Sequence, residues 1–197
     1  MTYRQEKKIS INSNSIFKIK KFLSINGFKK THPQRRVNSI YFDTHSFSMH
    51  KQSEEGSLPR KKIRLRWYND FDNSKIYLEK KISLFDKKFK SSDFIKKNDF
   101  YDLTKKGINQ NFYGLCLPKV VTSYQRNYFQ KSSFRVTIDT NICYKNYLSN
   151  TPFYDSSPIM EVKYSLDVPE KAYSNIFFFT ETRFSKYSRA INAIYKK

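Results

Sequence analysis

The sequence has 197 residues, of which 38 are Lys or Arg and 17 are Asp or Glu, so its formal net charge is +21 at pH 7. Aromatic residues make up 17% of the chain, which supplies the bulky side chains of a folded core and argues against disorder. The glycines are isolated, whereas phosphate-binding loops and dinucleotide fingerprints need clustered glycines. We therefore expect a single, strongly basic folded domain over residues 1–197 that lacks both of those nucleotide motifs.

The sequence also argues against several cellular contexts. Its longest apolar run, residues 176–179, is far too short for a transmembrane helix, and residues 1–8 are charged and lack the apolar core of a signal peptide. Cys116 and Cys143 are far apart and form no C-x-x-C pattern, which argues against a disulfide framework or a zinc site. We therefore expect a cytoplasmic protein.

Alternating patterns predict many strands and few helices. The expected strands cover residues 3–11, 38–43, 60–68, 75–83, 120–129, 134–140 and 159–164. The expected helices follow residues 12–14 and end at Gly27, lie near 99–106, run from Pro169 to about Thr180, and cover 186–195. Residues 53–59 are expected to be a polar loop, and 84–118 a polar, lysine-rich stretch around the second helix. Two hairpins are expected, 60–68 with 75–83 and 120–129 with 134–140. Together these elements predict an α+β protein or barrel.

Charged residues alternate along nearly every expected strand. Residues i and i+2 of a strand share a face. Strand 60–68 therefore places on one face Arg60, Lys62, Arg64 and Arg66, and on the opposite face Ile63, Leu65 and Trp67. The same rule groups Arg4, Glu6 and Lys8; Tyr77, Glu79 and Lys81; Tyr124, Arg126 and Tyr128; Arg135, Thr137 and Asp139; and Glu161 and Lys163.

A solvated sheet face is the ordinary explanation of such a pattern on one strand. A plain solvated face, however, would draw freely on Ser, Thr, Asn and Gln, and these strands repeat basic residues and carboxylates instead. If the sheet closes, these faces line an interior, where charges need ion pairs or an anionic ligand. One guanidinium group can donate two parallel hydrogen bonds to phosphate oxygens, and carboxylates hold Mg²⁺ or Mn²⁺ on phosphates. The pattern therefore favours a polyphosphate ligand with a divalent metal.

At these residues the sequence resembles a known family. The stretches that carry the resemblance are RQEKK, VNSIYFDT, RKKIRLRWY, YLEKK, TSYQRNYF, FRVTIDT, MEVKY and RFSKYSRAI. Their order and spacing over residues 3–194 resemble the VTC domain, the polyphosphate polymerase domain of the triphosphate tunnel metalloenzyme superfamily. The resemblance implies an α+β fold, an eight-stranded antiparallel β-barrel tunnel with peripheral helices. It also implies synthesis of inorganic polyphosphate from ATP, with Mn²⁺ or Mg²⁺ in the tunnel.

The resemblance also implies roles for individual residues. Phosphate binding is implied for Lys8, Arg64, Arg66, Lys81, Tyr124, Arg126, Arg135, Lys163, Ser185 and Lys186. Catalytic roles are implied for Arg64, Arg66, Lys81, Arg126 and Lys186. Glu161 matches the metal-binding glutamate, while Glu6 and Glu79 match tunnel carboxylates that either bind metal or orient the basic residues.

Some of these residues also have simpler interpretations. Ser185 could be only a helix N-cap and Lys186 plain surface. Asp139 is expected to cap a turn more readily than to bind metal, and Tyr41 and Asp43 are expected to be structural.

Three functions remain open at this stage. The leading one is a polymerase that uses ATP and inorganic polyphosphate; the others are a triphosphate or polyphosphate hydrolase on the same tunnel and a non-catalytic polyphosphate-binding module. Nucleic acid is disfavoured as a partner because most aromatic residues lie in apolar, core-like positions rather than in exposed stacking positions. Eukaryotic family members carry an accessory phosphate-sensing domain and membrane helices. This sequence shows neither, so we expect a stand-alone version, and a membrane-associated partner remains open.

Overall fold

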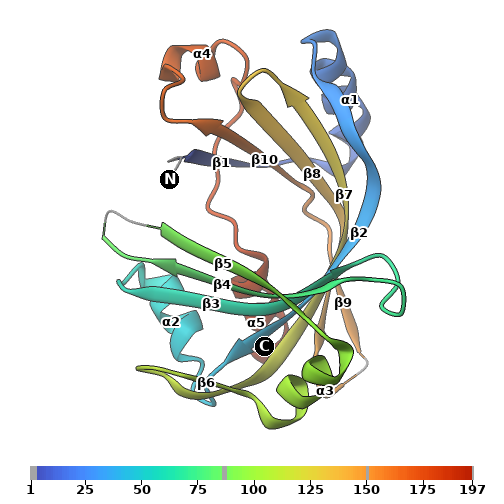
Figure 1. Ribbon diagram of the computed structural model, residues 1–197. Coiled ribbons are helices and arrows are strands. Elements are labelled where there is room, and N and C mark those ends of the chain that lie inside the picture. The colour runs from blue at the N-terminus through green and yellow to red at the C-terminus, as the bar shows by residue number, and fades with distance from the viewer. Residues whose placement is uncertain (1–3, 86–87, 150, 197) are drawn as a thin grey trace. The chain divides into compact units, whose positions relative to one another are not determined.

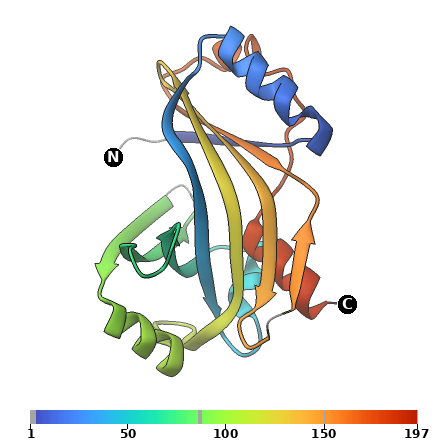
Figure 2. The ribbon, with the colours of Figure 1, turned by 90° about the vertical axis from the view of Figure 1, so that its right-hand side faces the viewer.

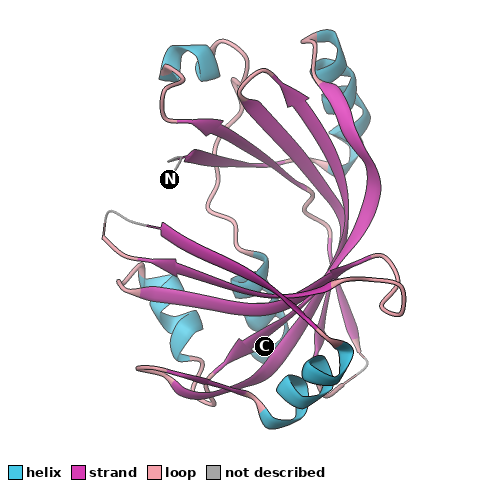
Figure 3. Cartoon of the chain, in the orientation of Figure 1, coloured by secondary structure: helices cyan, strands magenta, loops and turns pink. Residues whose placement is uncertain are grey.

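The computed structural model describes residues 4–85, 88–149 and 151–196, with strands as its main elements (Figures 1 and 3). The strands are β1 (Arg4–Ser10), β2 (Lys29–Asp43), β3 (Arg60–Tyr68), β4 (Ile76–Ser83), β5 (Lys88–Ile95), β6 (Ile108–Gln110), β7 (Gly114–Lys131), β8 (Phe134–Asn146), β9 (Pro152–Asp155) and β10 (Ile159–Ser165). The helices are η1 (Ser13–Ser15), α1 (Ile16–Ile25), α2 (Ser48–Glu55), α3 (Lys97–Lys106), α4 (Glu170–Ser174) and α5 (Lys186–Tyr195). Within the described residues, no helix is both long and apolar enough to cross a membrane.

The strands form one sheet, in the order β1-β10-β8-β7-β2-β3-β4-β5, with β6 and β9 paired to β7 and β8 at its side. The long strands β2, β7 and β8 run next to one another (Figure 2). The pairs β1–β10, β10–β8, β2–β3, β3–β4 and β4–β5 are antiparallel. The expected α+β class with a large antiparallel sheet is confirmed. The described pairs form an open path from β1 to β5, whereas the resemblance implies a closed barrel.

The chain packs as two compact units, each assembled from distant segments. The first unit comprises residues 1–36, 124–142 and 155–184. The second unit comprises residues 37–123, 143–154 and 185–197. Strands β2, β7 and β8 contribute residues to both units.

Each unit has an apolar core on the face of its strands opposite the alternating charges. In the first unit this core includes Ile9, Val136 and Val162. In the second unit it includes Ile63 and Leu65, both 0% exposed, as the alternation in β3 predicts. Burial of these alternate residues fixes the strand register, because a one-residue slip would move them to the other face. The charged side chains on the other face therefore have defined neighbours.

Several strands extend beyond the prediction or lie outside it. Strands β7 and β8 are longer than expected, β6 and β9 were not expected, and β2 and β5 differ most in character. Strand β2 begins at Lys29 rather than at residue 38, and the added residues up to Arg36 are nearly all exposed, so they show no apolar alternation. Contacts with β7 support them, including Arg35 over the Tyr128 ring at 5.3 Å. Strand β5 lies within the stretch expected to be polar and lysine-rich, and pairs with β4 although none of residues 89–95 is buried.

Two helices also differ from the prediction. Helix α2 occupies Ser48–Glu55, partly within the expected loop 53–59. The Asp43 carboxylate accepts hydrogen bonds from the backbone N–H groups of Met49 and His50, both at 3.0 Å, so a side chain from the end of β2 caps this helix in place of its N-cap residue, Phe47. Helix α4 ends at Ser174 instead of reaching residue 180, which leaves Phe177 to pack in the core of the first unit. The expected final helix, 186–195, is confirmed.

Candidate functional site

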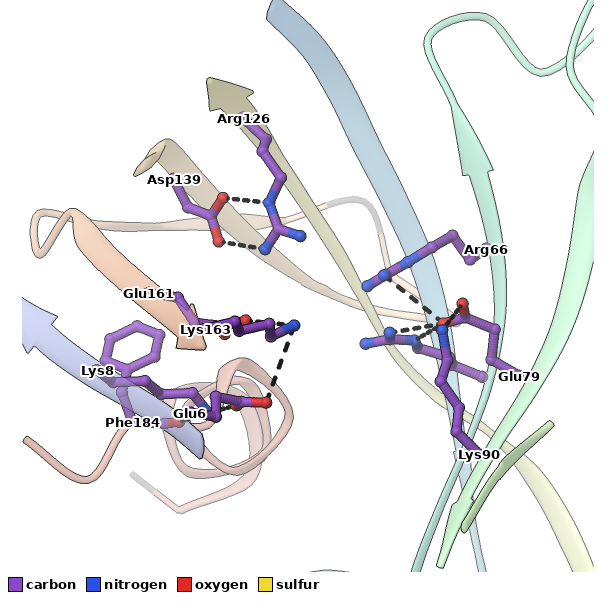
Figure 4. Close-up of polar contacts among 11 residues, drawn as sticks. Glu6, Lys8, Arg66, Glu79, Lys90, Arg126, Asp139, Glu161, Lys163 and Phe184 are labelled. Atoms are coloured by element: carbon purple, nitrogen blue, oxygen red, sulfur yellow. Dashed lines mark hydrogen bonds and ion pairs between the residues drawn. The ribbon is translucent and has the colours of Figure 1, made fainter. Parts of the chain in front are cut away.

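A carboxylate surrounded by three cations lies on the charged face of the second unit (Figure 4). The β3–β4 register places Arg64 directly opposite Glu79. Glu79 Oε2 accepts from Arg64 Nε at 2.7 Å and lies 2.6 Å from Arg64 Nη2 and 3.6 Å from Arg66 Nη1. Glu79 Oε1 accepts from Lys90 Nζ, on β5, at 2.7 Å. One carboxylate thus orders three basic side chains.

This cluster keeps a positive excess at neutral pH. Burial would raise the pKa of Glu79, whose side chain is 8% exposed, but Arg64, Arg66 and Lys90 outweigh burial and lower this pKa to about 2. Glu79 is therefore ionised, and its single negative charge leaves two of the three positive charges uncompensated by it. Such a surface attracts an anion that can accept several hydrogen bonds.

Strand β2 supports the two arginines from the other side. Its register with β3 places Tyr41 opposite Arg64 and Ser39 opposite Arg66. Arg64 Nη1 donates to the Tyr41 hydroxyl at 2.8 Å, and Arg66 Nε donates to Ser39 Oγ at 3.1 Å. The orientation of each guanidinium is therefore fixed from two neighbouring strands.

The N-terminus of α5 also belongs to the second unit and lies against β3. Ser185 is its N-cap, and Ser185 Oγ accepts from the Ser188 N–H at 3.3 Å and from Lys62 Nζ at 3.0 Å. Lys186 is the first residue of the helix. Lys81, which is exposed, lies opposite Lys62 in the β3–β4 register. The N-cap interpretation of Ser185 is confirmed, and its contact with Lys62 adds a second role for the same hydroxyl.

In the first unit, acidic and basic residues alternate across β1 and β10 (Figure 4). The register pairs Lys8 with Glu161 and Glu6 with Lys163. Lys8 Nζ lies 3.1 Å from Glu6 Oε1, and Lys163 Nζ lies 2.7 Å from Glu161 Oε1 and 3.9 Å from Glu6 Oε2. Lys8 Nζ also donates to the Phe184 carbonyl at 2.8 Å.

Glu161 is kept ionised by its neighbours. Its burial favours the neutral acid, yet Lys163, Arg126 and Lys8 outweigh this effect and hold its pKa well below the usual range. Its side chain is 13% exposed. A charged carboxylate in this position can pair with cations or coordinate a metal.

Strands β7 and β8 add an Arg–Asp pair to the first unit. Arg126 donates from Nε to Asp139 Oδ1 at 2.6 Å and from Nη2 to Asp139 Oδ2 at 2.7 Å. The Arg126 guanidinium also lies over the Tyr124 ring, 5.2 Å from its centroid. Burial lowers the pKa of Arg126, but Tyr124 and Asp139 outweigh it and raise this pKa well above its ordinary value. Asp139 thus pairs with an arginine, a role that differs from both sequence-based interpretations. Arg135, on β8 like Asp139, is exposed and lies opposite Lys163 of β10.

Carboxylates of the first unit fit the divalent metal that the family implies. Within residues 4–85, 88–149 and 151–196 no three His, Cys, Asp or Glu side chains gather into a metal-binding group. Mg²⁺, however, is usually bound by one or two carboxylates together with substrate phosphates and water. Glu161 and Glu6 provide two carboxylates on adjacent strands. Glu79 is contacted by three cations, Arg64, Arg66 and Lys90, whereas Glu6 is contacted by two lysines. This difference favours the orienting role for Glu79 among the two that the sequence left open.

Two basic residues of the second-unit cluster were absent from the set implied by the resemblance. The alternation of β3 places Lys62 on the face of Arg64 and Arg66, as the sequence predicted, although the resemblance implied no role for it. Lys90 lies on β5, a strand with no apolar alternation, and no signal in the sequence marks it.

A comparison with known protein families identifies the family of this chain. Residues 3–195 match the VTC domain, and the chain therefore belongs to the VTC domain family. This match confirms the resemblance to the VTC domain that was identified in the sequence. It covers residues of both compact units. No match was found among curated proteins.

Solved structures share this fold at low sequence identity. The PH1819 protein of Pyrococcus horikoshii OT3 is 12% identical, with a TM-score of 0.62 over 97% of this chain and 99% of the other. A conserved hypothetical protein of Pyrococcus furiosus is 11% identical, with a TM-score of 0.59 over 94% and 99%. A candidate adenylate cyclase of Bacillus halodurans is 11% identical, with a TM-score of 0.58 over 92% and 95%. These similarities show the fold alone.

Proposed function

We propose that this VTC domain is a polyphosphate polymerase that transfers the γ-phosphate of ATP to a growing chain of inorganic polyphosphate. The observation that carries the proposal is the ordered cluster of Arg64, Arg66 and Lys90 around the ionised Glu79. Three cations with one carboxylate form a preorganised site for a ligand that carries several negative charges. Membership of the VTC family supports phosphate chains as that ligand.

The reaction requires little covalent chemistry from the protein. An oxygen of the terminal chain phosphate attacks the γ-phosphorus of ATP, the bond from this phosphorus to the β,γ-bridging oxygen breaks, and ADP leaves with that oxygen. The acceptor oxygen is already ionised, so no general base is needed. Positioning of the two phosphate groups and stabilisation of their charge then account for the rate increase.

In the second unit, we assign phosphate binding to Arg64, Arg66, Lys81, Ser185 and Lys186. The two guanidinium groups can each offer paired N–H donors to phosphate oxygens. The N-terminus of α5 adds backbone N–H groups and the positive end of the helix dipole, both of which favour an anion next to Lys186.

In the first unit, we assign phosphate binding to Lys8, Tyr124, Arg126, Arg135 and Lys163. Arg126 Nη1 has no partner among the described residues, since Asp139 takes Nε and Nη2. Asp139 therefore fixes one edge of the Arg126 guanidinium, and the other edge, with Nη1, is presented to the phosphate ligand.

Glu161 and Glu6 would hold Mn²⁺ or Mg²⁺, which would neutralise phosphate charge when bound. Their contacts with Lys163 orient both carboxylates before the metal arrives, and the lowered pKa of Glu161 keeps that carboxylate ionised. We propose further that the sheet closes into the family's eight-stranded tunnel, and that the enzyme acts in the cytoplasm, where ATP is available.

Substitution of the assigned residues tests the proposal. Arg64→Ala and Lys186→Ala should each abolish polyphosphate synthesis while the proteins stay folded by circular dichroism. Lys106→Ala is the matched control, because Lys106 is 72% exposed on α3 and its ion pair among the described residues is with Asp102, one turn earlier in the helix. Wild-type synthesis by a folded Arg64→Ala protein would overturn the assignment.

A further inference from the structure

Tyr41 was expected to be structural, yet its hydroxyl contacts a proposed phosphate-binding residue. Arg64 Nη1 donates to this hydroxyl at 2.8 Å, and the Arg64 guanidinium lies 5.6 Å from the centroid of the Tyr41 ring. The other donors, Nε and Nη2, point to Glu79. Tyr41 and Glu79 thus hold Arg64 from the two strands that flank β3. Tyr41 itself is 5% exposed, so its ring has a fixed position.

The Tyr41 ring continues this arrangement toward α5. It stacks on the Tyr187 ring, with centroids 5.1 Å apart and an interplanar angle of 26°. The Tyr187 hydroxyl donates to Asp43 Oδ2. Asp43 is 0% exposed and also accepts from the N–H groups of Met49 and His50, which begin α2. Tyr187 is the second residue of α5, next to Lys186.

We propose that Tyr41 is a positioning residue that fixes the Arg64 guanidinium and joins it, through Tyr187 and Asp43, to the phosphate-binding N-terminus of α5. The proposal rests on the proposed function, because it explains how two of its phosphate-binding elements keep a constant geometry. All of these residues lie in the second unit. Tyr41 need not touch the substrate itself.

A physical argument favours a hydroxyl at this position. A long arginine side chain loses considerable rotamer entropy when it is held in one orientation, so each contact made before the substrate arrives lowers the cost of binding. Removal of the hydroxyl deletes one hydrogen bond to a charged donor but leaves the stacked ring in place. Because this bond exists before the substrate arrives, only part of its free energy contributes to substrate affinity, and a contribution of about 1 kcal/mol corresponds to about a fivefold change.

The surroundings of Tyr41 add a second, pH-dependent readout. Burial raises its pKa, but Arg64, Arg66 and Lys62 outweigh burial and lower this pKa to about 8. From α5 the ring faces Tyr187, whose pKa is raised well above its ordinary value by burial and by Asp43. Two other titratable groups are separated from Tyr41 by one intervening residue. Glu79 contacts Arg64, and the His50 ring of α2 lies 6.1 Å from the Tyr187 ring. Glu79 has a pKa of about 2, and burial lowers that of His50.

Among the groups named above, Tyr41 is therefore the one that contacts Arg64 and changes its charge between pH 7 and pH 9. Once ionised, its phenolate pairs with the Arg64 guanidinium and cancels one positive charge beside the substrate. Wild-type affinity for a phosphate chain should then fall over this range, and Tyr41→Phe should not show that fall. At pH 7 the hydroxyl strengthens binding by positioning Arg64, and at pH 9 its charge opposes binding.

The test uses tripolyphosphate as a probe and isothermal titration calorimetry at pH 7 and pH 9. We expect Tyr41→Phe to bind about fivefold more weakly than wild type at pH 7, and this difference to shrink or reverse at pH 9. Tyr173→Phe is the control, because Tyr173 is 3% exposed in the first unit and its hydroxyl has no hydrogen-bond partner among the described residues. The control should match wild type at both pH values.

Two results would separate the failure of this inference from the failure of the proposed function. If the wild type binds tripolyphosphate and Tyr41→Phe shows the same affinity at both pH values, the positioning role is wrong and the proposed function stands. If the wild type fails to bind tripolyphosphate at all, the proposed function itself fails, and the role of Tyr41 fails with it.

Discussion

Asp139 holds Arg126 through two parallel hydrogen bonds, from Nε to Oδ1 at 2.6 Å and from Nη2 to Oδ2 at 2.7 Å. The Asp139 side chain is 1% exposed and that of Arg126 is 15% exposed. Two charges this deeply buried are tolerated only when they are paired. The pair therefore fixes the position of a proposed phosphate-binding arginine and at the same time makes Arg126 dependent on Asp139.

Asp139→Asn should be strongly destabilising, because it leaves the buried Arg126 without a countercharge. Breaking a buried ion pair in this way typically costs about 3–5 kcal/mol of unfolding free energy. Urea denaturation of both proteins at pH 7 measures the difference. Asp102→Asn is the control, since its pair with Lys106 is exposed and should change stability by less than about 0.5 kcal/mol. Equal, small effects of both substitutions would contradict the account.

Glu79 should give the second unit a stability that depends on pH. Its pKa is about 2 in the folded protein and 4.5 for the unperturbed side chain, so its contribution is complete above pH 4.5 and is lost as the pH falls toward 2. We therefore compare wild type with Glu79→Gln by urea denaturation between pH 6 and pH 3. The difference in unfolding free energy should shrink by about 2 kcal/mol over this range. A difference that stays constant with pH would show that these cations do not depress the pKa of Glu79.

Glu161→Gln should weaken Mn²⁺ binding in the presence of tripolyphosphate. The amide keeps the size of the side chain but lacks the negative charge that the metal requires. We expect a loss of about tenfold or more, since even partners outside the first coordination shell contribute about 10- to 100-fold. Calorimetric titration with Mn²⁺ measures the affinity. Glu55→Gln serves as the control, because Glu55 is exposed at the end of α2. An unchanged Mn²⁺ affinity of Glu161→Gln would remove Glu161 from the metal site.

The strand faces were predictable wherever apolar residues alternate with charged ones. In β3, Ile63 and Leu65 are fully buried, so the sequence alone assigns Arg64 and Arg66 to the opposite face. Lys90 shows the limit of this reasoning. Its strand, β5, has no buried face, and its role depends on pairing with β4.

The partners of the charged groups could not be predicted in the same way. Asp139 follows an apolar strand pattern that is compatible with a turn cap, and only the arrangement of β7 and β8 brings it to Arg126. Tyr41 lies in an apolar stretch typical of core, and only the β2–β3 register reveals its contact with Arg64. Alternation within one strand assigns faces, whereas ion pairs and hydrogen bonds depend on register between strands.

The most direct test of the proposed function follows the phosphorus atoms themselves. Purified protein is incubated with ATP and Mn²⁺, and the products are examined by phosphorus NMR, with the Arg64→Ala protein as the matched control. The account predicts growth of the internal-phosphate signal of a polymer, together with ADP, for the wild type alone. Free phosphate without polymer would identify a hydrolase, and unchanged ATP would leave no catalytic role for this chain on its own; either result would contradict the proposed polymerase activity.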